Sequence, residues 1–408
     1  MSAQKKADRR DARVGPENHP ERPGRGMTRS YQGRTLAGDA VEVTVEGAVI
    51  ASVLPIRSAR VLPLIAPPLV DLQQNGALGH AFVDLDQDPA GLAVVAAHVR
   101  RHGVGRMLAT FTTHPLQRAQ ASLVEFNRQL SATPDLERLY SGIFYEGNYM
   151  SPLEGWRGMH DPTLMREPRL SEWSALQEAA GGRIRVFNIA PELPRAIETI
   201  REAVRHGLRV SMGHCCPDAD TIRRAVDAGA DLVTHLGNGA PAMLPRHQNP
   251  FWTWLADERV KIGLIADGFH LPADFLRAAI AAKGRDKVYL VSDASGHSGM
   301  PPGDYGQFHI EANGRCRLKG TELLAGAWYQ ADRCVEHMCE LGWPLADAWR
   351  QQSVIPARIF GLTLPELTAG EPAEFVLASW QPQEGLRLEQ VVALGRELLD
   401  APVHPKTI

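Results

Sequence analysis

Between about Ile65 and Asp293 the chain repeats one pattern: a short apolar, β-branched run, a polar cluster, and then a helical stretch. The runs are LPLIAPPLVDLQ, RMLATFTTH, RLYSGIFYEGN, RIRVFNIAPE, LRVSMGHC, DLVTHLGN, VKIGLIADGFH and KVYLVSDASG. Runs this apolar are typical of parallel strands that are covered on both faces. Eight of them within about 230 residues predict an α/β fold, a closed (β/α)8 TIM barrel rather than an open sheet.

The stretches between the runs have helical periodicity. In AIETIREAVRHGL, for example, the charged residues fall on one face of a helix and the apolar residues on the other. Gly207 follows the last turn and is expected to end this helix.

Outside the barrel, alternating runs predict antiparallel strands. EVTVEGAVIASV near the start, and EFVLASW and LEQVVALGREL near the end, are expected to meet in one small β-sandwich. GQFHIEANGRCRLKG holds Asn-Gly between two alternating runs, which predicts a hairpin after the eighth strand. The expected division is a disordered tail at 1–26, sandwich segments at 27–62 and 363–408, and the barrel at 63–362, with Met27 as an alternative start.

Composition narrows the class of partner. The chain has 408 residues, of which 44% are hydrophobic and 22% charged, as in ordinary soluble globular proteins. Lys plus Arg number 44 against 47 Asp plus Glu, so nothing favours nucleic acid or an anionic membrane, and a small-molecule partner is expected. Five cysteines without CxxC spacing favour a reducing cytoplasm over a disulfide framework, and neither a secretory signal nor a membrane span is visible.

The candidate chemistry lies where the predicted strands end, because the active site of such a barrel lies at the carboxyl ends of its strands. The polar residues that close the eight runs are Asp71 and Gln73, His114, Glu146, Glu192, His214, His235, Asp267 and His270, and Asp293.

Glu146, His214 and His235 close the third, fifth and sixth runs. One carboxylate and two imidazoles leave a position of a divalent metal open for water, which is the pattern of a catalytic metal site. Any one of these histidines alone would more often be a structural residue. Asp293 closes the eighth run and is placed to take a proton from the attacking water, whereas the alternative is a helix N-cap.

These residues stand in segments that resemble the N-acetylglucosamine-6-phosphate deacetylases of the amidohydrolase superfamily, from about Pro67 to about Leu362. The segments that carry the resemblance are VDLQQNG, YEGNYMSPLEGWRGMHDP, NIAPE, VSMGHC, VTHLGNGAPAMLPR, GLIADGFH, LVSDASG and IPARIFGL. The resemblance implies a cytoplasmic homodimer that uses one divalent metal ion, zinc or else iron, to remove an acetyl group from N-acetylglucosamine 6-phosphate.

The resemblance also implies roles for single residues. Glu146, His214 and His235 would hold the metal, while Asp293 would act as the base that later protonates the leaving amine. His160 would polarise the substrate carbonyl. The residues that would hold the sugar and its phosphate are His160, Asn238, Gly239, Arg246 and His270.

Two segments depart from the family pattern. Phe144-Tyr145-Glu146-Gly147-Asn148 stands where the family commonly has His-Leu-Glu-Gly-Pro, and the segment 246–250 replaces an Arg-Glu-Pro-Gly type run. Trp252 and Trp254 follow it and are expected to be core residues of the next helix. These changes keep two alternatives open: an amidohydrolase for a non-phosphorylated N-acyl substrate, and a catalytically silent barrel that binds a sugar phosphate.

The first strand ends in LVDLQQNG, where many metal hydrolases of this superfamily have a His-x-His pair. Gln73 and Asn75 occupy those positions, and neutral amides are poor ligands for zinc. We therefore expect a vacated second-metal position and a one-metal site, with Gln73 hydrogen-bonded to Asp293 or to the attacking water.

Overall fold

The computed structural model of the protein describes residues 28–398. The tail predicted at 1–26 and the alternative start at Met27 lie outside the described residues. Within 28–398, no helix is long and apolar enough to cross a membrane.

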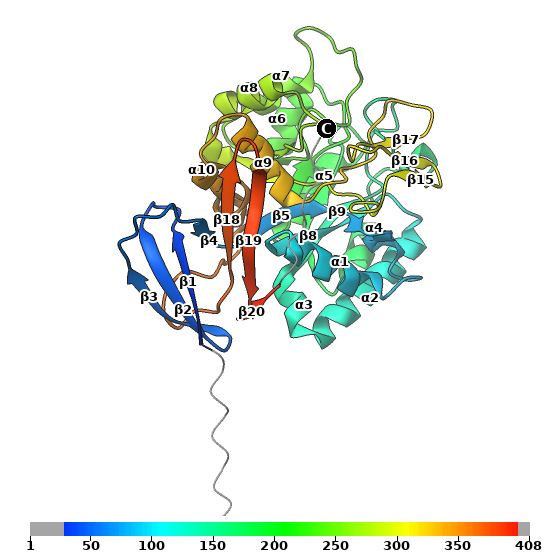
Figure 1. Cartoon of the computed structure of the whole chain (residues 1–408). Coiled ribbons are helices and arrows are strands. Elements are labelled where there is room, and N and C mark those ends of the chain that lie inside the picture. Colours follow the sequence, from blue (N-terminus) through cyan, green and yellow to red (C-terminus); the bar gives the residue numbers. More distant parts are fainter. Residues whose placement is uncertain (1–27, 399–408) are drawn as a thin grey trace, which may run out of the picture.

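The predicted barrel is confirmed: eight parallel strands form one sheet in the order β14-β13-β12-β11-β10-β9-β8-β5, with helices packed around it (Figure 1). The strands are β5 (Leu69–Gln74), β8 (Val104–Thr112), β9 (Tyr140–Glu146), β10 (Ile184–Asn188), β11 (Arg209–Met212), β12 (Leu232–Val233), β13 (Lys261–Ile265) and β14 (Val288–Val291). The helices are α1 (Gly91–Arg101), α2 (Leu116–Ala132), α3 (Pro134–Leu139), α4 (Leu170–Ala179), α5 (Ala196–Arg205), α6 (Ala219–Asp227), α7 (Pro250–Ala256), α8 (Ala273–Lys283), α9 (Ala331–Glu340), α10 (Leu345–Gln352) and α11 (Val354–Phe360). Short elements complete this part: β6 (Gly76–Ala77), β7 (His80–Ala81), η1 (Phe82–Asp84), η2 (Pro162–Leu164) and η3 (Arg285–Lys287).

The terminal segments meet as expected, in a seven-stranded sheet of order β20-β19-β18-β4-β1-β2-β3. Its strands are β1 (Thr28–Arg34), β2 (Ala40–Glu46), β3 (Val49–Pro55), β4 (Leu64–Ala66), β18 (Phe375–Gln381), β19 (Gly385–Ala393) and β20 (Arg396–Glu397). The N- and C-terminal halves enclose a core of their own, in which the Tyr31 and Phe375 rings pack edge to face with 5.2 Å between centroids.

The first apolar run holds two strands instead of one. Pro67 and Pro68 separate β4 from β5, because proline lacks the N–H that a strand ladder needs. β4 pairs with β18 and β1 of the terminal sheet, and β5 alone enters the barrel. The hairpin predicted after the eighth strand is present as β16 (Phe308–Ile310) and β17 (Cys316–Leu318). A third strand, β15 (Gly303–Tyr305), pairs with β16 and completes a three-stranded sheet.

A partly buried ion-pair cluster on α9 contacts the loop that follows β13. Arg333 contacts Glu336 at 2.8 Å and Glu340 at 2.6 Å, and its Nε donates to the carbonyl of Asp267 at 3.2 Å. Partial burial opposes ionisation of Glu340, but hydrogen bonds from His337 and Arg333 lower its pKa from 4.5 to about 2.

Glu340 should therefore contribute to acid resistance. Between pH 4.5 and about 2 the unfolded chain binds a proton that the folded chain does not, so this stabilisation is complete above pH 4.5 and is lost as pH falls towards 2. Glu340→Gln should lower the Tm near pH 6 by about 1–3 °C and flatten its fall between pH 5 and 3, as measured by thermal melts across that range. Asp220→Asn on α6, whose side chain is 88% exposed, serves as the control. Parallel pH slopes for Glu340→Gln and the native chain would contradict the assignment.

Candidate active site

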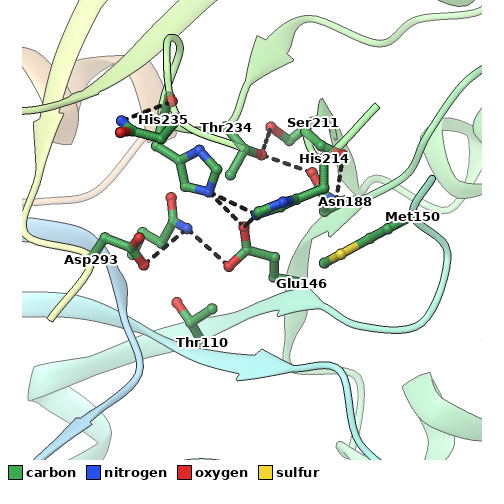
Figure 2. A network of polar contacts seen from close by, with 12 residues as sticks. Thr110, Glu146, Met150, Asn188, Ser211, His214, Thr234, His235 and Asp293 are labelled. Carbon is green, nitrogen blue, oxygen red and sulfur yellow. Dashed lines mark hydrogen bonds and ion pairs between the residues drawn. The ribbon is translucent and has the colours of Figure 1, made fainter. Parts of the chain in front are cut away.

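Three ligand atoms converge at the carboxyl ends of the barrel strands. Nε2 of His235 lies 3.1 Å from Nε2 of His214 and 3.1 Å from Oε1 of Glu146, and His214 Nε2 lies 3.4 Å from the same oxygen (Figure 2). All three residues are buried. Burial opposes ionisation of Glu146, but the hydrogen bonds from His214 and His235 hold its pKa below the ordinary value.

This donor set fits one divalent metal. Tetrahedral bonds of about 2.0–2.2 Å to nitrogen and oxygen separate ligand atoms by roughly 3.3–3.6 Å, close to the spacing found here. Two imidazole nitrogens that face each other at 3.1 Å need a proton or a cation between them. Within residues 28–398, Glu146, His214 and His235 are the one group of His, Cys, Asp or Glu side chains that gathers in this way.

The backbone that presents these side chains is unusual. His214, His235 and Asp293 each stand two residues beyond their strand, with φ of 52°, 29° and 50°. Residues other than glycine seldom enter this left-handed region, and each instance costs on the order of 1–3 kcal/mol. Three strained residues at one mouth therefore have to be held by surrounding contacts.

The contacts around His214 fix its ring. Its Nδ1 donates to the carbonyl of Trp156 at 3.0 Å, which leaves the Nε2 lone pair directed at the convergence point. Gly239 packs beside the same nitrogen: a Cβ there would lie 2.7 Å from His214 Nδ1, so only glycine lets this loop approach the ring. Any larger residue would displace the imidazole.

A polar floor lies beneath the two histidines. The hydroxyls of Ser211 and Thr234 lie 2.6 Å apart, and Thr234 donates to the Asn188 side chain at 2.8 Å (Figure 2). These residues come from β10, β11 and the end of β12, directly before the turns that carry His214 and His235. The floor therefore couples the two ligand-bearing turns.

Asp293 lies beside Glu146 and is held by two amides. Asn75 Nδ2 donates to Asp293 Oδ1 at 2.9 Å, and Gln73 Nε2 donates to the same oxygen at 3.3 Å and to Glu146 Oε2 at 2.9 Å. Gln73 thus makes the contact to Asp293 that the sequence predicts. Burial raises the pKa of Asp293 above its ordinary value, with His235 opposing and Glu146 adding to the effect. No helix begins at Asp293, so the N-cap alternative is wrong.

His160 and His270 border the same site. The His160 ring packs edge-on against His214 at 4.6 Å between centroids, and burial together with that neighbour lowers its pKa to about 3, so that the imidazole is neutral. His270 Nδ1 donates to the Asp267 carboxylate at 2.7 Å, which leaves its Nε2 for another partner. Although burial opposes it, Asp267 raises the pKa of His270 above the ordinary value.

The remaining predicted binding residues lie on the loop that follows β12. Asn238 donates to the carbonyl of His235 at 3.3 Å. Arg246 is exposed, and its side chain makes no hydrogen bond or ion pair with any residue in 28–398. Trp254 is a core residue of α7 as expected, but the same expectation is wrong for Trp252, which is 56% exposed.

The sequence reading missed one buried pair, Asp71 with Ser292. Asp71 appears among the strand-end residues without a role, but its carboxylate accepts the backbone N–H and the hydroxyl of Ser292. Burial raises the pKa of Asp71 to about 7, while the bonds from Ser292 oppose the shift. A carboxylate inside an apolar strand was the available signal, because such a group needs a buried partner.

A barrel of parallel strands that gathers one carboxylate, two imidazoles and a second carboxylate at its mouth defines a metal-dependent hydrolase. No family model matches the chain. It is 31% identical over 370 residues to the N-acetylgalactosamine-6-phosphate deacetylase of Escherichia coli O157:H7, covering 88% of this chain and 94% of that protein. It is also 31% identical to the N-acetylglucosamine-6-phosphate deacetylase of Bos taurus, covering 77% and 79%.

Solved structures agree with these relatives. The N-acetyl-D-glucosamine-6-phosphate deacetylase of Mycobacterium smegmatis superimposes with a TM-score of 0.79 at 28% identity, over 91% of this chain and 100% of that one. A mutant of the same enzyme in complex with N-acetyl-D-glucosamine-6-phosphate gives the same TM-score over 92% of this chain. The chain belongs to the N-acetylglucosamine-6-phosphate deacetylase family of the amidohydrolase superfamily.

Proposed function

We propose that this protein hydrolyses the acetamide of an N-acetylated amino sugar 6-phosphate, N-acetylglucosamine 6-phosphate first among them, to the free amine and acetate. The observation that carries the proposal is the convergence of Glu146, His214 and His235 next to Asp293. The names of the relatives support the substrate class. A free cation at Arg246 is the group that a phosphate needs.

Glu146, His214 and His235 would hold one divalent metal ion, zinc or iron. When bound, such an ion lowers the pKa of water and stabilises negative charge on a carbonyl oxygen. Gln73 and Asn75 support a count of one, because their amides take the place of second-metal ligands and are already bonded to the Asp293 and Glu146 carboxylates.

The protein's own residues manage the protons. Asp293 accepts a proton from the attacking water and delivers it to the amine nitrogen as the C–N bond breaks. The neutral His160 donates a hydrogen bond to the acetyl carbonyl oxygen, where negative charge develops. Gln73 and Asn75 both bond to Oδ1 of Asp293, which leaves Oδ2 for the water.

Acetate release tests the proposal directly. The purified protein, loaded with zinc or with iron, is assayed on N-acetylglucosamine and N-acetylgalactosamine, each with and without the 6-phosphate. Activity on a 6-phosphate is expected, with about one metal per chain by elemental analysis. An absence of acetate from all four sugars would overturn the proposed function, and two metals per chain at full activity would overturn the one-metal site.

Arg246→Ala separates the phosphorylated substrate from its alternative. If Arg246 binds the phosphate, its loss should raise KM for the 6-phosphate by about 10- to 100-fold and leave kcat nearly unchanged, since the contact is the same in ground and transition states. The unphosphorylated sugar supplies the matched control, because its KM should not change. Equal effects on both sugars would favour an N-acyl substrate without phosphate.

The homodimer and the cytoplasmic location stay predictions. Sedimentation analysis of the purified chain measures the first, and a monomer at micromolar concentration would contradict it. Fractionation of the native cell measures the second.

A further inference from the structure

The barrel sheet closes where its two end strands, β5 and β14, meet. Within residues 28–398, one isolated backbone bridge between Gln74 and Ala294 joins this seam. Buried side chains complete the closure. Gln352 of α10, for example, donates from one amide nitrogen to the carbonyls of Val70 at 2.8 Å and Leu290 at 3.2 Å.

Asp71 crosses the same seam at the level of the candidate site. It is fully buried on β5, and one of its carboxyl oxygens accepts the backbone N–H of Ser292 at 3.1 Å. The other oxygen accepts the Ser292 hydroxyl, which in turn accepts the backbone N–H of Ala294 at 3.0 Å. The Asp71 carboxylate thus holds, directly and through one hydroxyl, the residues on both sides of Asp293.

The turn that Asp71 holds is strained. Asp293 has a φ of 50°, and its backbone is also fixed from outside: its N–H donates to the carbonyl of Gln73 and its carbonyl accepts from Ala327, each at 2.9 Å. A residue released from the left-handed region relaxes to the β or right-handed region, which redirects its side chain. The direction of the Asp293 carboxylate therefore depends on the contacts that hold Ser292 and Ala294.

We propose that Asp71 is a positioning residue that, through Ser292, keeps Asp293 in its strained conformation and its carboxylate directed at the attacking water. The inference rests on the proposed function, in which Asp293 transfers the proton. Asp71 itself is buried behind the turn. Besides Ser292, its Oδ1 accepts the backbone N–H of Gln73 at 3.4 Å, and the Gln73 side chain bonds to Asp293, so this contact acts on the same carboxylate.

Asp71→Asn is the first test. Asparagine has one acceptor oxygen where Asp71 has two, so the side chain can no longer accept both the backbone N–H and the hydroxyl of Ser292, while the volume stays the same. The kcat for acetate release should fall by about 100-fold, as for a small misplacement of a catalytic group, with KM within about threefold of the native value. The metal content should stay at that of the native enzyme, because Asp71 contacts none of the three ligands.

A second measurement separates positioning from general stability. In an Asp293→Asn background, Asp71→Asn should lower the residual kcat no further, since a residue that acts through Asp293 has nothing left to act on. Gln352→Leu, which removes a buried bond pair across the same seam, is the matched control. It should lower the Tm but keep kcat within about threefold of native.

Three results would overturn the role of Asp71. An unchanged kcat in Asp71→Asn, an equal loss of kcat in both backgrounds, or a matching loss in Gln352→Leu overturns the inference. If Asp71→Asn does not fold, Ser292→Ala removes only the bridging hydroxyl and is judged by the same criteria. A native enzyme that releases no acetate overturns the proposed function instead, so the two failures are distinguishable.

Discussion

Asp293→Asn should lower kcat by about 10²- to 10⁴-fold, the range for loss of a general base. The asparagine can keep the bonds from Gln73 and Asn75 on its oxygen, and asparagine tolerates the left-handed backbone at this position. What it loses is the ability to accept a proton from water. The fold, the metal and KM should therefore stay close to native while the chemical step slows.

Steady-state kinetics with parallel metal analysis and thermal melts check this expectation. Asp135→Asn on α3 is the control for loss of one carboxylate, because α3 precedes β9 and lies at the far end of the barrel from the site. A variant that keeps more than about a tenth of native kcat would show that Asp293 is not the base. One that loses its metal would instead make Asp293 part of the metal site.

The barrel could be predicted from sequence because its signal is local and repeated. Each strand is a short apolar run whose length and turn signals can be read without knowing its neighbours. The boundary between β4 and β5 was harder, because Leu64–Ala66 is as apolar as the strand that follows, and its partner β18 lies more than 300 residues away. Only Pro67 and Pro68 mark the change from one sheet to the other.

The metal site could be predicted because the strand-end rule brings distant residues to one mouth. Glu146, His214 and His235 are far apart in sequence but close the third, fifth and sixth strands, and the structure brings their ligand atoms within 4.8 Å. The supporting contacts could not be read this way. The carbonyl of Trp156 that orients His214 is a backbone group on a loop, and loop paths have no period.

The strain at the three strand ends could not be predicted either. His and Asp enter the left-handed region more often than most residues, but still too seldom for residue type alone to mark His214, His235 and Asp293. The strain gives those turns a physical role beyond carrying side chains. A strained turn persists only where its surroundings hold it, so the Asn188, Ser211 and Thr234 floor and the Asp71 contact belong to the site as much as its ligands do.

Glu146→Gln should remove the metal and, with it, activity by more than about 10³-fold, because the ion supplies both the activated water and the stabilisation of charge. A neutral amide is a weak ligand beside imidazole, and His214 and His235 alone leave the donor set incomplete. Glu192→Gln is the matched control: Glu192 is a second largely buried glutamate beyond a barrel strand, and its oxygen accepts the Cys216 N–H, which glutamine can also do.

Metal titration followed by dialysis and elemental analysis distinguishes the two variants. Glu192→Gln should retain about one metal per chain and Glu146→Gln very little, with partial recovery of activity only at a large excess of added metal. The recovery matters, because it separates a weakened site from a misfolded one. A Glu146→Gln enzyme that bound metal with native affinity would contradict the assignment. It would show that the Glu146 carboxylate, which accepts from Gln73, is a positioning group and that the two imidazoles and another donor hold the metal.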